Sequence, residues 1–251
     1  MRSPTARPLA GMDQIPMPSC PEQAADTLKM LSETTRRSFL GRGLAAAVGV
    51  PAAVLATSSG AKAAGGSTLP SYYAGQTLKL FQEIQTDEAS HVDILLIAIQ
   101  SLGGTPRPYP TFQDITVGDA QQFLKLSNAF ENTGVHAYLG AVGYIENPNV
   151  LSVAASIALV EGYHAGWLNA LANMPLVPGG ITYATSDTIP EVVNAVQPYI
   201  ASLNDPGNNF PASFSTTPSA ANDIAILNFA LLLEYLEATF YFESVPRVFA
   251  S

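Results

Sequence analysis

Two copies of the pattern Glu-x-x-His constrain this chain more than any other feature. The first copy is Glu88 with His91, and the second is Glu161 with His164. Residues three apart lie on one face of an α-helix, so the carboxylate and the imidazole of each pair point the same way. Each pair stands in the middle of a stripe of apolar residues spaced three and four apart, which is typical of a core-facing helix. The sequence therefore predicts two core helices, each burying a glutamate beside a histidine.

Apolar periodicity predicts four long helices, so the expected fold class is all-α with a four-helix bundle. The helices are expected at about 73–102, 118–147, 148–173 and 221–243. The second and third are joined by a very short turn, which makes them antiparallel neighbours. The last is apolar on nearly every side, which predicts full burial.

Two connections of the predicted bundle are long. Residues 103–117 contain three prolines and are expected to be extended. The segment at about 174–221 is rich in Pro, Gly, Ser, Thr and Asn, with a short helix expected at 191–203. Its length suits a crossover, a lid over the end of the bundle or an interface.

The other two helices each carry a central glutamate of their own. Glu131 lies on the inner face of the second helix, with a surface position as the alternative interpretation. Glu234 is central in the last helix, and Glu237, one turn later, is the less central candidate. Tyr138 and Tyr241 each follow their glutamate by seven residues, two turns along the same face. The chain thus contains two chemically equivalent helix pairs, each with Glu…Tyr and Glu-x-x-His.

This donor set predicts a dinuclear metal site. Carboxylate-bridged sites in four-helix bundles take Glu-x-x-His from two helices and one glutamate from each of two others. The predicted ligands are Glu88, His91, Glu131, Glu161, His164 and Glu234. Glu88 and Glu161 would bridge the ions, and four carboxylates would neutralise two divalent cations. Oxygen and nitrogen donors suit Fe and Mn equally well.

Two other interpretations bear on this site. A metal-free bundle with Glu–His hydrogen-bond networks is the alternative to the dinuclear site. The third histidine, His136, is five residues past Glu131 and about 140° away around the helix. Packing, or support of a ligand, is therefore the expected role of His136.

Charge and cysteine content exclude several classes of protein. The net charge is −9, and from residue 64 onward there are four basic and sixteen acidic residues. This balance argues against nucleic acid or an anionic membrane surface as a partner. Cys20 is the only cysteine, so no disulfide framework or cysteine-based zinc site is expected.

The N-terminal part predicts export. Residues 1–33 show no periodicity and are expected to be a disordered extension. Residues 34–40, TTRRSFL, resemble the twin-arginine export signal, and an apolar stretch and the small-x-small sequence Ala61-Lys62-Ala63 follow. A membrane anchor is the alternative, but Arg42 and Pro51 interrupt the short apolar stretch. The predicted signal is 34–63, the predicted domain is 64–251, and the expected location is periplasmic or extracellular, free of the membrane after cleavage.

Four segments together resemble the ferritin-like proteins, in particular exported bacterial members called desiccation-related. They are EIQTDEASHVDILLIAIQSLGG, FENTGVHAYLGAV, SIALVEGYHAGWLNAL and LNFALLLEYLEATFY, and they contain all six predicted ligands. In that family the LNFALxLEYLE helix normally comes first, whereas here it is last. The resemblance therefore implies a permuted helix order, or a homodimer in which the C-terminal helix is exchanged.

The resemblance and the donor set together imply redox chemistry with O2 or peroxide, of the ferroxidase, peroxidase or catalase type, in oxidative or desiccation stress. Tyr138 and Tyr241 would hydrogen-bond the ligands or donate electrons. A non-catalytic protein that uses its metal as a structural staple is the alternative, and iron storage in a cage is less favoured.

Overall fold

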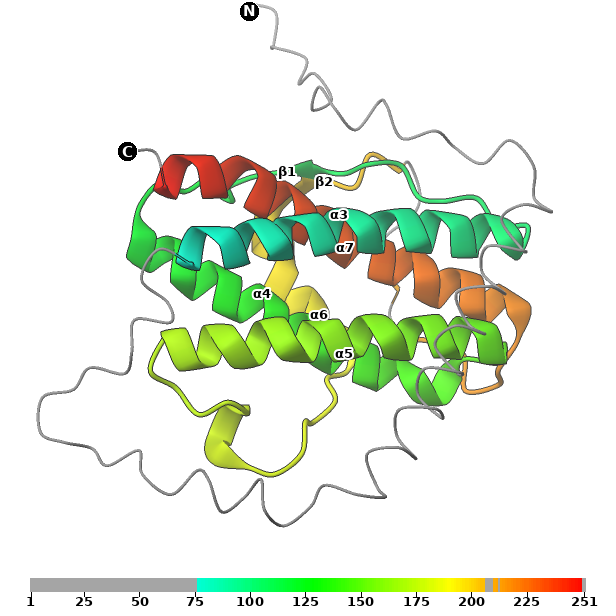
Figure 1. The fold of residues 1–251 in the computed structure, drawn as a ribbon. Helices are drawn as coiled ribbons and strands as arrows, with labels where there is room; N and C mark the ends of the chain where they lie inside the picture. The colour runs from blue at the N-terminus through cyan, green and yellow to red at the C-terminus, as the bar shows by residue number, and fades with distance from the viewer. Residues whose placement is uncertain (1–75, 206–209, 212, 250–251) are drawn as a thin grey trace, which may run out of the picture.

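The computed structural model describes residues 76–205, 210, 211 and 213–249, and this part of the chain forms a helical bundle (Figure 1). Its four long helices are α3 (Thr77–Ser101), α4 (Ala120–Ala141), α5 (Pro148–Leu171) and α7 (Ala220–Val248). Helix α3 packs mainly along α7, and α4 packs mainly along α5. The predicted all-α four-helix bundle is confirmed. The predicted extension at 1–33 and the export signal at 34–63 lie outside the described residues.

Local capping signals set most helix boundaries. At the start of α4, α5 and α7, the side chains of Asp119, Asn147 and Ser219 accept hydrogen bonds from backbone N–H groups of the first turn. Helix α3 ends before Gly103, whose φ of 73° is readily adopted only by glycine. These signals explain why the predicted starts and the predicted end of the first helix lie close to the observed ones.

Helix α7 is longer than predicted. The expected end near Glu243 is wrong, because the helix continues to Val248 with Pro246 in its last turn. The extra turn is held by the connection before α4. The hydroxyl of Ser244 donates to the carbonyl oxygen of Ile115 at 2.9 Å and accepts from the N–H of Val117 at 3.1 Å. Tertiary contacts thus extend the helix beyond Glu243, where the sequence pattern predicted its end.

The two long connections meet each other on one side of the bundle. Strands β1 (Thr111–Phe112) and β2 (Ile200–Ser202) pair in antiparallel fashion. The short helix expected at 191–203 is wrong in its second half, since α6 (Ile189–Val196) is followed by a 3-10 turn and then β2. Helix α6 packs against α4. The described part of this segment crosses over along the side of the bundle (Figure 1), which was one of the three alternatives.

Two hydrophobic clusters fill the bundle. One cluster includes Leu95, Ile157 and Leu231, and the other includes Phe81, Phe123 and Phe240. Along α3, α4 and α5 the predicted ligands fall between these clusters, whereas along α7 members of both clusters lie on each side of Glu234. The ligands therefore occupy a polar layer that is closed by apolar side chains at both ends.

Helix α7 is the one described helix that is long and apolar enough to cross a membrane. Its most apolar window has a mean hydropathy of 1.4, but 83% of that window is buried inside the bundle. Its hydrophobicity is that of a central core helix, as the sequence predicted.

Candidate metal site

All six predicted ligands lie together in the middle of the bundle. They form two overlapping groups, Glu88, His91, Glu161 and Glu234, and Glu88, Glu131, Glu161 and His164. The possible ligand atoms within each group lie within 4.8 Å of one another. Glu88 and Glu161 belong to both groups, as bridging carboxylates would. One chain supplies all six residues, so the cluster does not require a helix from a neighbouring subunit.

Each histidine points Nδ1 into the cluster. His91 Nδ1 lies 3.1 Å from Glu161 Oε1 and 3.3 Å from Glu234 Oε2. His164 Nδ1 lies 3.0 Å from Glu88 Oε1 and 3.1 Å from Glu131 Oε2. Each imidazole therefore contacts one glutamate that belongs to both ligand groups and comes from the opposite helix. It also contacts the one glutamate that belongs to its own ligand group alone.

The two tyrosines cross between the helix pairs. Tyr138 Oη donates to Glu234 Oε1 at 2.5 Å, and Tyr241 Oη donates to Glu131 Oε1 at 2.6 Å. The sequence placed each tyrosine on the same face as the glutamate seven residues before it. In the structure each tyrosine instead holds the glutamate of the other helix pair. The phenols thereby orient the two glutamates that are not shared.

The cluster has an excess of buried negative charge. The four predicted glutamate ligands are fully buried, and Glu237 is 3% exposed. No lysine or arginine is among the buried residues of the described chain. Glu161 Oε2 and Glu237 Oε2 have no hydrogen-bond partner, and Glu88 Oε1, Glu161 Oε1 and Glu234 Oε2 each face only an imidazole Nδ1 that also contacts another carboxylate. Each buried atom without a partner costs about 1–3 kcal/mol, more when charged. Cations bound among these oxygens and the two imidazoles would supply the missing partners, so the residues fit a metal centre.

Without cations, the cluster offsets this charge by retaining protons. Burial, with the nearby charge of Glu131, raises the pKa of Glu88 to about 7. Burial likewise raises the pKa of Glu161 well above its ordinary value, and the charge of Glu88 adds to the shift. Burial alone would lower the pKa of His164, but hydrogen bonds to Glu131 and Glu88 raise it to about 11. Burial would also lower the pKa of His91, but the charge of Glu234 and hydrogen bonds to Glu161, Glu234 and Glu88 raise it above its ordinary value. Binding divalent cations would displace these protons.

The structure separates the two glutamates of α7. Glu234 contacts His91 and accepts from Tyr138, whereas Glu237 belongs to neither group of possible ligands. Burial would raise the pKa of Glu234, but the charge of His91 and hydrogen bonds from His91 and Tyr138 lower it. Burial and the charge of Glu88 raise the pKa of Glu237 well above its ordinary value. Glu234 is thus held as a carboxylate, and Glu237 is favoured as a neutral acid beside the cluster.

His136 lies away from the cluster. Its Nδ1 is 3.5 Å from Asp187 Oδ2, and its backbone carbonyl oxygen accepts from the N–H of Asp187 at 3.2 Å. These contacts join α4 to the segment before α6. His136 therefore has the packing position that its direction on the helix predicted.

Two contributors to the site were not singled out from the sequence. Asp87 Oδ2 lies 3.1 Å from His164 Nε2, on the side of the ring that faces away from the cluster. Gly134 lies so close to Glu161 that a β-carbon there would be 2.9 Å from Oε2. Both relationships cross from one helix to another. Helical spacing within a single segment carries no signal for either.

A pocket at the surface between α3 and α5 reaches the edge of the cluster at His164. It has a volume of about 360 Å³, and its lining includes Glu83, Asp87, Tyr163, His164 and Trp167. His164 thus separates the pocket from the buried glutamates. A molecule in this pocket would meet the imidazole and the Asp87 carboxylate first.

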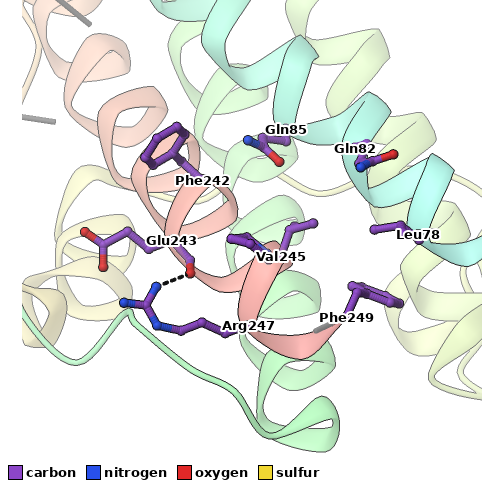
Figure 2. Close-up of a pocket in the computed structure, with 9 residues that line it drawn as sticks. Leu78, Gln82, Gln85, Phe242, Glu243, Val245, Arg247 and Phe249 are labelled. Carbon is purple, nitrogen blue, oxygen red and sulfur yellow. Dashed lines mark hydrogen bonds between the residues drawn. The ribbon is translucent and has the colours of Figure 1, made fainter. Parts of the chain in front are cut away.

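A larger pocket of about 560 Å³ lies between α3 and the end of α7 (Figure 2). Figure 2 shows Gln82 and Gln85 on one side and Phe242, Glu243 and Arg247 on the other. Glu243 accepts a hydrogen bond from Thr116. None of the six predicted ligands lines this pocket, so it is separate from the candidate metal site.

Comparison with known proteins gives one positive result. Residues 44–174 match the family described as ferritin-like domain, and this segment is more than half of the chain. No curated protein and no solved structure shows significant similarity to this chain. The matched segment includes α3, α4 and α5 with every predicted ligand except Glu234, which α7 brings to the cluster from beyond the match. From this match and the helical bundle, we conclude that the chain belongs to the ferritin-like domain family.

Proposed function

We propose that this chain is an exported dimetal-carboxylate protein that carries out redox chemistry with O2 or peroxide. The observation that carries the proposal is the pair of overlapping ligand groups that share Glu88 and Glu161. Two positions that share two carboxylates and have one imidazole each suit a carboxylate-bridged pair of ions. Iron and manganese both favour such donors.

The protein's own residues would hold and orient this pair. Glu88 and Glu161 would contribute to both metal positions, His91 with Glu234 would complete one position, and His164 with Glu131 would complete the other. Tyr138 and Tyr241 would fix one oxygen of each unshared glutamate and leave the other oxygen for the metal. A pair of iron or manganese ions would supply one-electron redox chemistry toward O2 or peroxide.

The surroundings support chemistry away from bulk water. The hydrophobic clusters on both sides close the ends of the polar layer, and the pocket would bring a small molecule as far as His164. Glu237 would hold a proton beside the cluster without occupying a ligand position. Reduction of O2 or peroxide consumes protons, so a neutral acid at this place suits the proposed reaction.

A non-catalytic role is the second candidate. The unpartnered carboxylate oxygens favour it as well, because bound ions would stabilise the folded bundle whether or not they react. The two functions differ in redox turnover, and the pocket beside His164 favours the first. Both require bound metal.

Metal content is the first test. The protein should be purified from the exported fraction of its own cells, and the metal per chain should be counted. We expect two Fe or Mn per chain, and loss of both on Glu161→Ala, which removes a shared carboxylate. The matched control is Glu146→Ala, because Glu146 is exposed and lies outside both ligand groups. A protein that folds in the presence of chelator and never carries metal would contradict both candidate functions.

Turnover distinguishes the two candidates. The loaded protein should be mixed with Fe(II) and O2, and separately with hydrogen peroxide, while consumption of each oxidant is followed. Catalytic consumption beyond the bound metal would support the redox function. Stable metal with no consumption of either oxidant would favour the structural role.

Export and a stress role rest on sequence and resemblance. The twin-arginine pathway carries folded proteins, which suits a protein that binds its metal before export. Replacing both Arg36 and Arg37 with lysine should retain the protein in the cytoplasm, as cell fractionation would show. Deletion of the gene should reduce survival of drying or peroxide, and unchanged survival under both conditions would contradict the stress role.

A further inference from the structure

The two histidines of the cluster differ in what lies behind the ring. His164 has Nδ1 in the cluster and Nε2 3.1 Å from Asp87 Oδ2. In the part of the chain that the structure describes, the polar contacts of His91 all go through Nδ1. Both ring nitrogens of His164 therefore have polar partners, whereas His91 has such partners at Nδ1 only.

This difference traces to one sequence position. Asp87 directly precedes Glu88 on α3, and Val160 directly precedes Glu161 on α5. The two helices run in opposite directions (Figure 1). Val160 therefore holds in the motif of α5 the position that Asp87 holds in the motif of α3, and it lines the pocket beside His164 together with Asp87. The side chain of Val160 has no polar atom with which to hold a ring nitrogen.

The carboxylate behind His164 has a physical consequence for metal binding. A ring N–H that donates to a carboxylate fixes the tautomer, so the other nitrogen keeps its lone pair for the metal. The hydrogen bond also fixes the ring's orientation and makes the ligating nitrogen more basic. Loss of such a partner typically weakens metal binding by about 10–100-fold.

The other charged groups near the cluster do not give the metal position of His91 a partner equivalent to Asp87. Glu237 interacts with His91 and Glu234 as well as with Glu88 and Glu131, so it is not confined to one half. It belongs to neither ligand group. Glu83 and Asp87 line the pocket beside His164. These two carboxylates add negative charge near the metal position that contains His164.

We propose that the two metal positions are inequivalent, and that the position of His164 and Glu131 binds its ion first and more tightly. Asp87 acts as a positioning residue for His164, and Val160 leaves His91 without such support. This inference rests on the proposed dimetal function, and it specifies the order in which the site fills.

The test is an anaerobic titration of the metal-free full protein with Mn²⁺, followed by calorimetry and electron paramagnetic resonance. We expect two binding steps separated by about tenfold or more, from the usual effect of such a partner. The first equivalent should give the spectrum of an isolated ion. The second should convert this spectrum to that of a spin-coupled pair.

Three substitutions assign the order of binding. Asp87→Ala should weaken the first step by about 10–100-fold. Asp87→Asn keeps an acceptor without the charge and should have a smaller effect. Val160→Asp gives the motif of α5 the carboxylate that precedes Glu88 in the motif of α3, and should strengthen the second step. A gain in affinity cannot arise from a failure to fold, so this variant keeps the test informative if Asp87→Ala is unstable.

Glu83→Gln is the matched control, because Glu83 is exposed, lies one turn before Asp87 and lines the same pocket without contacting His164. It should leave both steps unchanged. Two equal steps in the wild-type protein, or steps that neither Asp87→Ala nor Val160→Asp alters, would overturn this inference alone. No Mn²⁺ binding by the wild-type protein would overturn the dimetal function and this inference with it.

Discussion

Gly134 on α4 leaves the space beside the carboxylate of Glu161 on α5, where a β-carbon would lie 2.9 Å from Oε2. Both residues are buried, and Oε2 of Glu161 has no hydrogen-bond partner. A side chain at this position would push the carboxylate out of the place that it shares between the two ligand groups. The absence of a side chain at position 134 is thus part of the geometry of the site.

Gly134→Ala should therefore weaken metal binding without unfolding the protein. Alanine favours a helix over glycine by about 1 kcal/mol, which partly offsets the strain, and the carboxylate is the flexible end of its side chain. We expect a decrease of at least tenfold in the affinity for the metal pair, measured by competition with a chelator. The control is Gly162→Ala, because a β-carbon at Gly162 on α5 meets nothing within 4 Å. Equal metal affinities of the two variants would contradict this role of Gly134.

Removal of the hydroxyl of Tyr138 should destabilise the protein and loosen one half of the site. Burial, with the charge of Glu234, raises the pKa of Tyr138 well above its ordinary value, so the phenol stays protonated and donates. Tyr138→Phe leaves Glu234 Oε1 without this donor, which should cost about 1–3 kcal/mol. Denaturant unfolding of the metal-free protein measures this loss.

Tyr241→Phe should have a similar effect through Glu131, because its hydrogen bond is nearly the same length. Tyr163 is 72% exposed and provides the control, since Tyr163→Phe should leave the free energy of unfolding unchanged. If the Tyr138 and Tyr163 variants were equally stable, the hydrogen bond to Glu234 would have no net value.

Substitution of the two glutamates of α7 should separate a ligand from a neutral neighbour. Glu234→Gln removes a carboxylate that contacts His91 and should abolish binding of one ion or both. Glu237→Gln replaces an acid that is already favoured as neutral with a group of similar size, and should retain the full metal content. Metal analysis of the two purified variants decides between them. Loss of metal from the Glu237 variant alone would reverse the assignment.

The metal-free protein should lose stability as the pH rises. The pKa of Glu88 is raised from 4.5 to about 7, so its protonated form favours the folded state below pH 4.5, and this contribution is lost by about pH 7. The pKa of His164 is raised from 6.5 to about 11, so its contribution is complete below pH 6.5 and is lost as the pH rises through 11. Both effects have the same sign.

Thermal unfolding with chelator present, measured from pH 5 to pH 9, should therefore show a falling Tm. Each kcal/mol lost lowers the Tm of a domain of this size by about 2–4 °C. With bound metal the dependence should be weaker, because cations replace protons as partners of the carboxylates. Glu88→Gln should flatten the part of the curve below pH 7. A Tm of the metal-free protein that rises over this range would contradict the charge balance described here.

The sequence was sufficient for the parts of this protein that depend on spacing along one helix. Glu88 and His91 share a face because they are three residues apart, and the apolar stripe around them requires that face to be buried. The same reasoning placed Glu131, Glu161 and Glu234 at mid-helix, and the capping residues set most of the helix ends. These features are local, so the order of residues alone specifies them.

Only the tertiary structure decided which helices face each other and at what register. The crossed bonds of Tyr138 and Tyr241, the contact of Asp87 with His164 and the space left by Gly134 each join two helices. The extra turn of α7 and the strand β2 likewise depend on partners distant in the sequence. Periodicity fixes the direction of a side chain relative to its own helix axis, whereas the packing of all four helices determines which atom that side chain meets.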